Sequence, residues 1–531
     1  MSKSIDSIIV GSYFLLIFIA GHFISRRYKS GDANDFITGG KTMNWFRTGL
    51  TVLAMGYDPG IIAHAGLGFL WGMYPMQWLG TTVWFTVWFC ALFLVPIYWR
   101  SRILTTPELL EKRFNVYSRV FFSLIMMSIL IVTLSFGVYL GALLLKSFLG
   151  WSMWMSIGLI SAVAAFYVIK GGMRTVLAID FYQALFLLAA QFVIGGMAFY
   201  KLGGFSGLAS IALTGKAGTS LVSTIPPSDW SPFTEIFYPM QSILTYQLCS
   251  GLAWLGISYA MVQRLLAARS EKDAQKALFL FGGIAPLACL PGYLVGVYMR
   301  VHAPDILPDQ SYPDFLLSMF PVGVRGILIA GLMAALLSSI DGMFTATGAL
   351  FTEDIYLRFI RPHAESSELK TVTRIVQGLC VVITIAVVPL VMQDSTALEF
   401  LQKFYGDVLG VLSAVYIAGI FSRRATPRAA FFGMVTGTGL AIGLDIMTTL
   451  NFAYVGTFSF IYTLGSILLL SRLEKPMADE RLTDLTIHTL HDVKGPLVGL
   501  KAWPNLWKWA IGLSVGWFAV TAAWEFYLVI H

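Results

Sequence analysis

Three oxygen-bearing side chains stand within one helical turn of a stretch that is otherwise apolar, residues 331–356. They are Ser338, Ser339 and Asp341. A carboxylate and two hydroxyls at membrane depth are costly unless they are paired, hydrated or bound to a cation. Because a small hard cation prefers oxygen ligands, the stretch predicts a cation site. Small residues recur along the same helix face and would let a second helix come close: Gly331, Ala335, Ser338, Gly342 and Ala346.

A second polar group interrupts the apolar stretch 45–71. Gly56, Asp58 and Pro59 fall near its middle. Pro59 removes a helical hydrogen bond, and Gly56 makes irregular backbone less costly. We expect the helix to unwind here and to free carbonyl oxygens, such as those of Leu53 and Gly56, for a cation. Asp58 either faces a substrate cavity beside this break or caps the half-helix that follows a simple proline kink.

The composition indicates the class of protein that must position these groups. Of 531 residues, 57% are hydrophobic and only 12% are charged, whereas a soluble protein carries roughly twice that charged fraction. The chain is therefore predicted to be a polytopic membrane protein within a lipid bilayer. Its net charge of +7 comes from short loops between apolar runs, so membrane topology accounts for it and no nucleic acid is expected. The four cysteines lie inside apolar segments without a CxxC pair, which indicates neither a disulfide framework nor a metal site.

Hydropathy predicts about fourteen membrane-spanning segments, each near the roughly twenty residues that a bilayer needs. Every second connection is basic, so the positive-inside rule places both the N- and C-termini outside. The compact loops suggest a multi-pass protein of the plasma membrane, specifically a bacterial inner membrane. Spans two and seven both carry helix-breaking residues, which is the pattern of an inverted-repeat transporter. The predicted spans are 7–25, 45–71, 76–98, 117–147, 152–170, 175–200, 239–265, 275–300, 323–350, 371–393, 398–421, 427–447, 451–471 and 506–529.

Six short motifs follow one another in a fixed order along most of the chain. They are FITGGK at 36–41, TPELLEKRF at 106–114, GGMRTV at 171–176 with Asp180 and Gln183 after it, QRLLAARS at 263–270, PVGVRG at 321–326 with AALLSS at 334–339, and TEDIY at 352–356. The second resembles a TIPEFxxxRF loop and the fourth a QRxLAAKS motif. Together the six motifs resemble the sodium/solute symporter family, most closely its sodium/sugar-cotransporter-like branch.

This resemblance implies an all-α polytopic membrane fold with a core of two inverted repeats of five helices each, the LeuT-like architecture. Residues 1–531 would then form a single transmembrane transporter domain. An extra N-terminal helix at 7–25 would precede an inverted-repeat core at 45–421, and peripheral helices would follow at 427–531.

The resemblance also implies a sodium ion between spans two and nine. Carried over by position, its ligands are the carbonyls of Leu53, Gly56 and Ala335 and the hydroxyls of Ser338 and Ser339.

A second sodium site in some family members uses an aspartate, matched here by Asp180, and hydroxyls one turn past the serine pair. At those hydroxyl positions this chain has Asp341 and Gly342. Three interpretations stay open: Asp341 strengthens a second cation site, holds a proton, or pairs with an inner arginine. Two neighbouring buried carboxylates favour protonation of one of them unless a cation lies between them.

The sugar-binding residues of the branch are not retained, because the positions of its span-seven Asn and span-eight Lys hold Gly251 and Phe281. Asp58 instead offers one negative charge. That charge suits a substrate with a cationic or amine group, with cation–π attraction to an aromatic ring as a second contact. The predicted substrate-binding residues are Asp58, Gln77, Trp254, Tyr259 and Gln402.

We therefore predict a sodium-coupled secondary symporter that imports a small organic solute by alternating access, with Na+ as its cofactor. The alternatives are a sodium/sugar or polyol symporter, a proton-coupled or metal-ion transporter on the same fold, and, in a different class, a membrane sensor or receptor. The metal alternative rests on Asp58-Pro59-Gly60, which resembles the start of the metal motif of natural-resistance-type transporters, although Ile61 stands where those have Asn. An enzyme is not expected, because no serine, histidine and acid set converges at helical spacing. The oligomeric state is not predicted.

Overall fold

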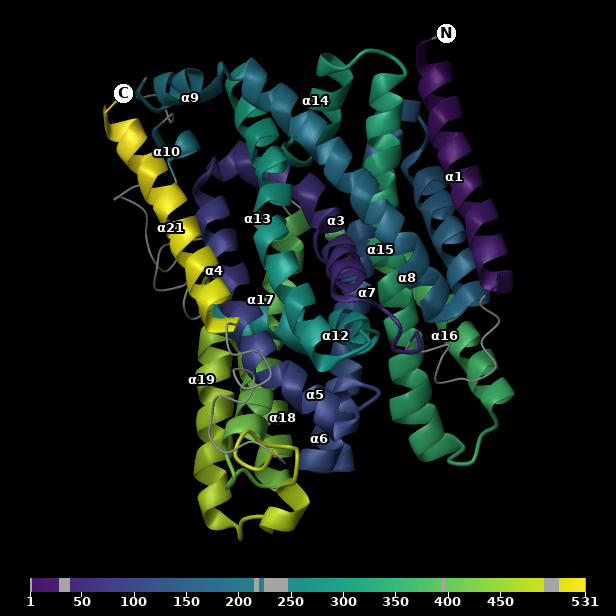
Figure 1. The fold of residues 1–531 in the computed structure, drawn as a ribbon, viewed down its shortest axis with the longest axis vertical. Coiled ribbons are helices and arrows are strands. Elements are labelled where there is room, and N and C mark those ends of the chain that lie inside the picture. The colour runs from purple at the N-terminus through teal and green to yellow at the C-terminus, as the bar shows by residue number, and fades with distance from the viewer. Residues whose placement is uncertain are drawn as a thin grey trace.

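The computed structural model describes residues 2–27, 39–213, 219–223, 247–393, 397–490 and 506–530. Within these ranges every regular element is a helix, apart from one β-bridge between Met43 and Ala268. Figure 1 shows the longer helices running side by side along the long axis of the molecule. The helices are α1 (Ser2–Arg27), α3 (Trp45–Trp71), α4 (Tyr74–Phe89), η1 (Cys90–Leu94), α5 (Val95–Ser101), α6 (Thr106–Arg113), α7 (Val116–Leu149), α8 (Met153–Lys201), α9 (Gly204–Leu213), α10 (Thr219–Val222), η2 (Gln247–Ile257), α12 (Tyr259–Leu266), α13 (Glu271–His302), η3 (Pro308–Gln310), α14 (Ser311–Met319), α15 (Val324–Leu350), η4 (Phe351–Ile360), α16 (Ser366–Val391), α17 (Ala397–Phe421), α18 (Pro427–Met447), α19 (Phe452–Leu470), η5 (Ser471–Leu473), η6 (Asp479–Leu482) and α21 (Leu506–Ile530).

The span formed by α15 and η4 is the most enclosed of the apolar spans in the described part of the chain. In its most apolar window 94% of the residues are buried, against 28% for α16 and 18% for α1. Its stripe of small residues accounts for this, because α3, α7 and α8 all pack against α15. The polar residues of α15 therefore face the protein interior and not the lipid, as the sequence predicted.

Helices α3 and α13 pack along each other at short range. A Cβ atom added to Gly68 would lie 2.6 Å from the carbonyl oxygen of Tyr293, and one added to Gly296 would meet the carbonyl of Ala65. Glycine at these two positions lets the two backbones approach closely. Helix α3 is thus held between α13 and α15.

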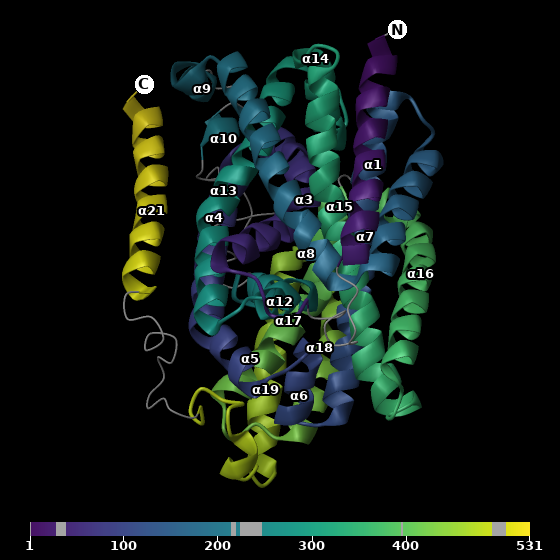
Figure 2. The same cartoon turned by 45° about the vertical axis from the view of Figure 1, so that its right-hand side comes forward.

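The loops gather at two ends of the molecule as their charge predicted. Helices α9 and α14 lie at the end where α1 begins and α21 finishes, while α6 and the start of α16 lie at the opposite end (Figure 1). Figure 2 shows the same division after rotation, with α21 at the edge of the bundle. Both termini thus lie on one side, which fits an even number of crossings.

Ten helices in the described residues are long and apolar enough to cross a bilayer, so the protein is a multi-pass membrane protein. The predicted fourteen crossings are not confirmed. Of the other four predicted segments, 45–71 corresponds to α3, 152–170 to the first part of α8 and 506–529 to α21. Segment 239–265 corresponds to η2 and α12 from residue 247 onward, and residues 239–246 lie outside the described residues.

Of the two predicted helix breaks, the structure contains one. In span seven, Ser258 has ψ of 122° and separates the π-helix η2 from α12, so the prediction for this span is confirmed. In span two, α3 is helical from Trp45 to Trp71, so the predicted unwinding around Gly56 and Pro59 is wrong. A proline removes a single helical hydrogen bond, and the helix continues because the carbonyl that loses this bond finds another donor, as described below.

Candidate functional site

The hydroxyl of Ser339 joins α15 to α3 inside the protein. Its Oγ donates to the carbonyl oxygen of Met55 at 2.7 Å and lies 3.4 Å from that of Ala54. In an α-helix the Met55 carbonyl would accept from the N–H of residue 59, but Pro59 has none. The proline thus frees an inward carbonyl that Ser339 reaches. Hydroxyl and carbonyl oxygens from two helices meet here, and this donor set fits a hard cation such as sodium.

The neighbouring serine turns toward a different helix. Ser338 Oγ donates to Asp180 Oδ1 of α8 at 2.6 Å, and the other carboxylate oxygen pairs with Arg264 Nη2 of α12 at 2.7 Å. Arg264 Nη1 also donates to the carbonyl of Ala260 at 3.0 Å. The side chains of Ser338, Asp180 and Arg264 are all fully buried. This ion pair connects α8, α12 and α15 directly beside the meeting point of α3 and α15.

The other predicted cation ligands lie in the same region with different neighbours. Leu53 and Ala335 are buried, and a Cβ on Gly56 would contact Met261, Phe281 and Trp254. The five predicted residues are thus divided: Ser339 binds α3, Ser338 binds Asp180, and Gly56 faces aromatic side chains.

Asp341 is fully buried on α15. It lies within electrostatic range of Tyr13 on α1, and the Tyr13 hydroxyl accepts from Gln183 Nε2 of α8 at 3.3 Å. Asp180, the other aspartate of the predicted second cation site, pairs with Arg264.

The predicted substrate residues separate into two groups. Trp254 of η2 lies beside Gly56, and the hydroxyl of Tyr405 interacts with Trp254 and with Thr133 Oγ1, the latter at 2.9 Å. Gln402 is almost buried one helical turn before Tyr405 on α17. Trp254, Tyr405 and Thr133 therefore form one polar and aromatic group, and Gln402 lies one helical turn from it on α17.

Tyr259 does not belong to that group. It is fully buried and lies within electrostatic range of Glu353 and Asp354, toward the end of the α15 span. The side chains of Asp58 and Gln77 lie outside the described residues. Thr133 and Tyr405 were not among the predicted residues; the place of Tyr405 one turn after Gln402 could have identified it.

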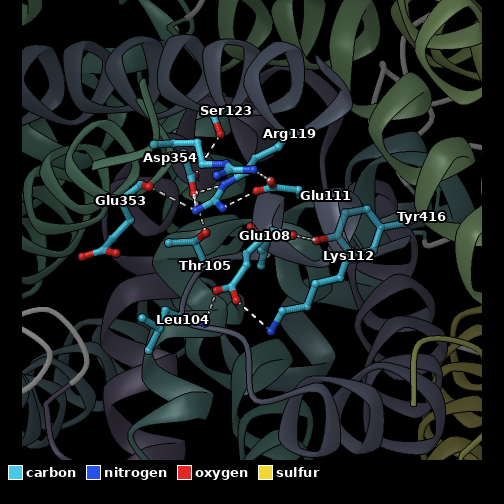
Figure 3. A network of polar contacts seen from close by, with 12 residues as sticks. Leu104, Thr105, Glu108, Glu111, Lys112, Arg119, Ser123, Glu353, Asp354 and Tyr416 are labelled. Carbon is cyan, nitrogen blue, oxygen red and sulfur yellow. Dashed lines mark hydrogen bonds and ion pairs between the residues drawn. The ribbon is translucent and has the colours of Figure 1, made fainter. Parts of the chain in front are cut away.

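A dense polar network holds α6, α7 and η4 together (Figure 3). Asp354 of η4 accepts from Arg119 Nε at 2.7 Å, from Thr105 Oγ1 at 2.7 Å and from Ser123 Oγ at 2.9 Å. Arg119 Nη1 also pairs with Glu111 of α6 at 2.6 Å. Asp354 is fully buried, so α6, α7 and η4 share one desolvated charge cluster.

Known proteins resemble this chain in both sequence and fold. A sequence model of the sodium:solute symporter family matches residues 36–437. The sodium/mannose cotransporter SLC5A10 of Bos taurus is 29% identical over 474 residues, which cover 83% of this chain and 78% of that protein. The sodium/glucose cotransporter of Vibrio parahaemolyticus is 28% identical over 481 residues, which cover 83% of this chain and 85% of that protein. A solved substrate-bound, outward-open structure of a Na+-coupled sialic acid symporter superimposes with a TM-score of 0.79 at 22% identity, covering 89% of this chain and 98% of that chain. The predicted all-α, LeuT-like fold class is confirmed.

Proposed function

Because the chain belongs to the sodium:solute symporter family, we propose that it is a sodium-coupled symporter that moves a small organic solute across its membrane by alternating access. The contact from Ser339 to the Met55 carbonyl carries the proposal. It brings oxygen atoms of α3 and α15 together in a buried place that suits a sodium ion. The family and its relatives are transporters and not enzymes.

Sodium would be held by the hydroxyls of Ser338 and Ser339 and the carbonyls of Leu53, Gly56 and Ala335. Because α3 is helical through Leu53 and Gly56, the carbonyl that Pro59 frees is that of Met55. A bound cation there supplies a positive charge between two helices that are distant in sequence. Coupling requires that the ion bind one conformation of the transporter more tightly than the other. Residues on two separate helices meet this requirement, because a movement of α3 relative to α15 changes their separation.

The substrate we propose is a small neutral solute with several hydroxyl groups. The hydroxyls of Thr133 and Tyr405, the amide of Gln402 and the ring of Trp254 support it, since a polyol needs paired donors and acceptors and an apolar ring face. The relatives above are named for mannose and glucose. The amine-bearing substrate predicted from Asp58 gains no such support.

We also propose that residues 45–421 form the inverted-repeat core, flanked by the helix at 7–25 and the peripheral helices at 427–531. Both termini lie at the end opposite α6, whose connection carries Arg100, Arg102, Lys112 and Arg113, and this supports an outside position for them. The bacterial inner membrane remains a prediction.

Uptake into proteoliposomes tests the proposal. An inward sodium gradient should drive accumulation of at least one of radiolabelled glucose, mannose or myo-inositol, while a potassium gradient should not. Ser339→Ala should lower sodium-driven uptake by about tenfold, since it removes a buried oxygen from the site. Ser156→Ala is the matched control, because within the part of the chain that the structure describes this buried hydroxyl donates to the Ser152 carbonyl four residues earlier, at 3.1 Å. Uptake of choline but no polyol would favour the amine substrate, and uptake without sodium dependence would refute coupling.

A further inference from the structure

The carboxylate of Asp180 already has a cation. Arg264 Nη2 lies 2.7 Å from Asp180 Oδ2, and both side chains are fully buried. Ser338 Oγ donates to the other carboxylate oxygen at 2.6 Å. An arginine stays charged in proteins, so the single negative charge of Asp180 is balanced by a permanent positive charge from the same chain.

Gly342 makes room for this arginine. A Cβ atom at position 342 would lie 2.5 Å from Arg264 Nη2 and 2.6 Å from Nη1, so any side chain there would displace the guanidinium. Family members with a second sodium site carry a hydroxyl at this position, according to the resemblance described above. Position 342 has no hydroxyl in this chain, and the guanidinium lies directly against the space that it would fill. The other hydroxyl position holds the fully buried carboxylate of Asp341.

A sodium ion at Asp180 would have to compete with Arg264 for the same oxygens. If it displaced the guanidinium, a buried charge would lose its partner, which is strongly unfavourable. The residues present therefore do not fit a second sodium ion at this aspartate.

We propose that Arg264 is the resident cation of Asp180, so that this transporter binds one sodium ion, at Ser339, and couples one ion to each substrate. The inference rests on the proposed sodium coupling and specifies its stoichiometry. Arg264 is a positioning residue in this view: it holds Asp180 and, through Ser338, the register of α15 against α8.

Equilibrium binding of radiolabelled sodium to the purified full-length protein tests the stoichiometry without knowledge of the substrate. We expect one ion per chain, lost in Ser339→Ala and retained in the control Ser156→Ala. Two ions per chain would overturn the inference while leaving the proposed function intact. No bound sodium at all would overturn both.

A second variant locates the ion. The double replacement Asp180→Asn with Arg264→Gln removes both charges and leaves no unpaired one, and it should keep one ion per chain. An ion that this variant loses and Ser339→Ala retains would place sodium at Asp180 and overturn the inference. If the double variant does not fold, the ion count of the wild-type protein decides alone.

Discussion

At the scale of single residues, Gly342 sets whether the Arg264 guanidinium fits between α3 and α15. A Cβ there would also lie 2.7 Å from Met55 Sδ, so the added atom would meet both Arg264 and α3. We expect Gly342→Ala to lower the free energy of unfolding by about 1–3 kcal/mol, the usual cost of overpacking a core. Thermal unfolding of the purified protein, followed by tryptophan fluorescence, measures this loss.

Gly439→Ala on α18 is the matched control for that variant, because nothing lies within 4 Å of its added Cβ. Alanine is the better helix former by up to about 1 kcal/mol, so the control should be neutral or slightly stabilising. An equal loss of stability in both variants would contradict the steric explanation.

Asp309, which lies outside the membrane-spanning helices, should make the free energy of unfolding depend on pH. It lies in η3, where its Oδ2 accepts from the N–H of Ala397 at the start of α17, 3.0 Å away. Burial raises the pKa of its carboxyl from 3.8 to about 6. Between those pH values the folded protein holds a proton that the unfolded chain has released, so the free energy of unfolding falls as the pH rises through this range. The fall is at most roughly 3 kcal/mol, and the contribution is constant above about pH 7.

The difference in unfolding free energy between wild type and Asp309→Asn isolates the contribution of the Asp309 carboxyl, because the other titrating groups are common to both proteins. Asparagine can still accept the Ala397 N–H, so the variant should lack the pH-dependent fall and keep the contact. Apparent melting temperatures measured from pH 4 to pH 7 provide the comparison. Parallel curves for the two proteins would contradict the assignment.

At the scale of helices, Asp354 determines how α6, α7 and η4 meet. Asp354→Asn removes the charge that faces Arg119, and breaking a buried ion pair costs about 3–5 kcal/mol. Thermal unfolding should show a loss of that order. Arg361→Gln is the control, because its partner Glu368 is 3.3 Å away and Arg361 is 65% exposed, where an ion pair contributes roughly 1 kcal/mol or less. Similar losses in the two variants would mean that burial does not strengthen this network.

The sequence predicted that the segments are helical and that α15 is enclosed by other helices. Of the two helix breaks that it predicted, only the one in span seven was found. The stripe of small residues correctly predicted that α15 lies inside the protein. The break at Ser258 was expected in its span, but the unwinding near Pro59 was not found. A proline in a sequence shows that one carbonyl loses its donor; it does not show that Ser339, 280 positions away by residue number, supplies a new one.

The sequence alone also could not show how residues from different helices come together in the candidate site. The serine pair identified the region, but which serine faces α3 and which faces α8 depends on helix rotation, which a pattern of hydroxyls does not specify. The pairing of Asp180 with Arg264 joins residues on separate helices and has no local sequence signal. Gln402 was recognised through the resemblance and Trp254 as an aromatic ring for a cationic substrate, whereas Thr133 and Tyr405 needed the packing of α7 against α17.

For the whole molecule, a sodium site shared by α3 and α15 predicts that sodium stabilises the fold. The unfolded chain cannot hold Met55 and Ser339 together, so the ion binds only the folded state. At ten times its dissociation constant it would add about 1.4 kcal/mol to the free energy of unfolding. The melting temperature should therefore rise with sodium chloride and not with equal potassium chloride, which controls for ionic strength. Ser339→Ala should abolish this difference while Ser156→Ala keeps it. An equal rise in both salts would indicate screening alone, and a sodium-specific rise that survives in Ser339→Ala would place the ion elsewhere.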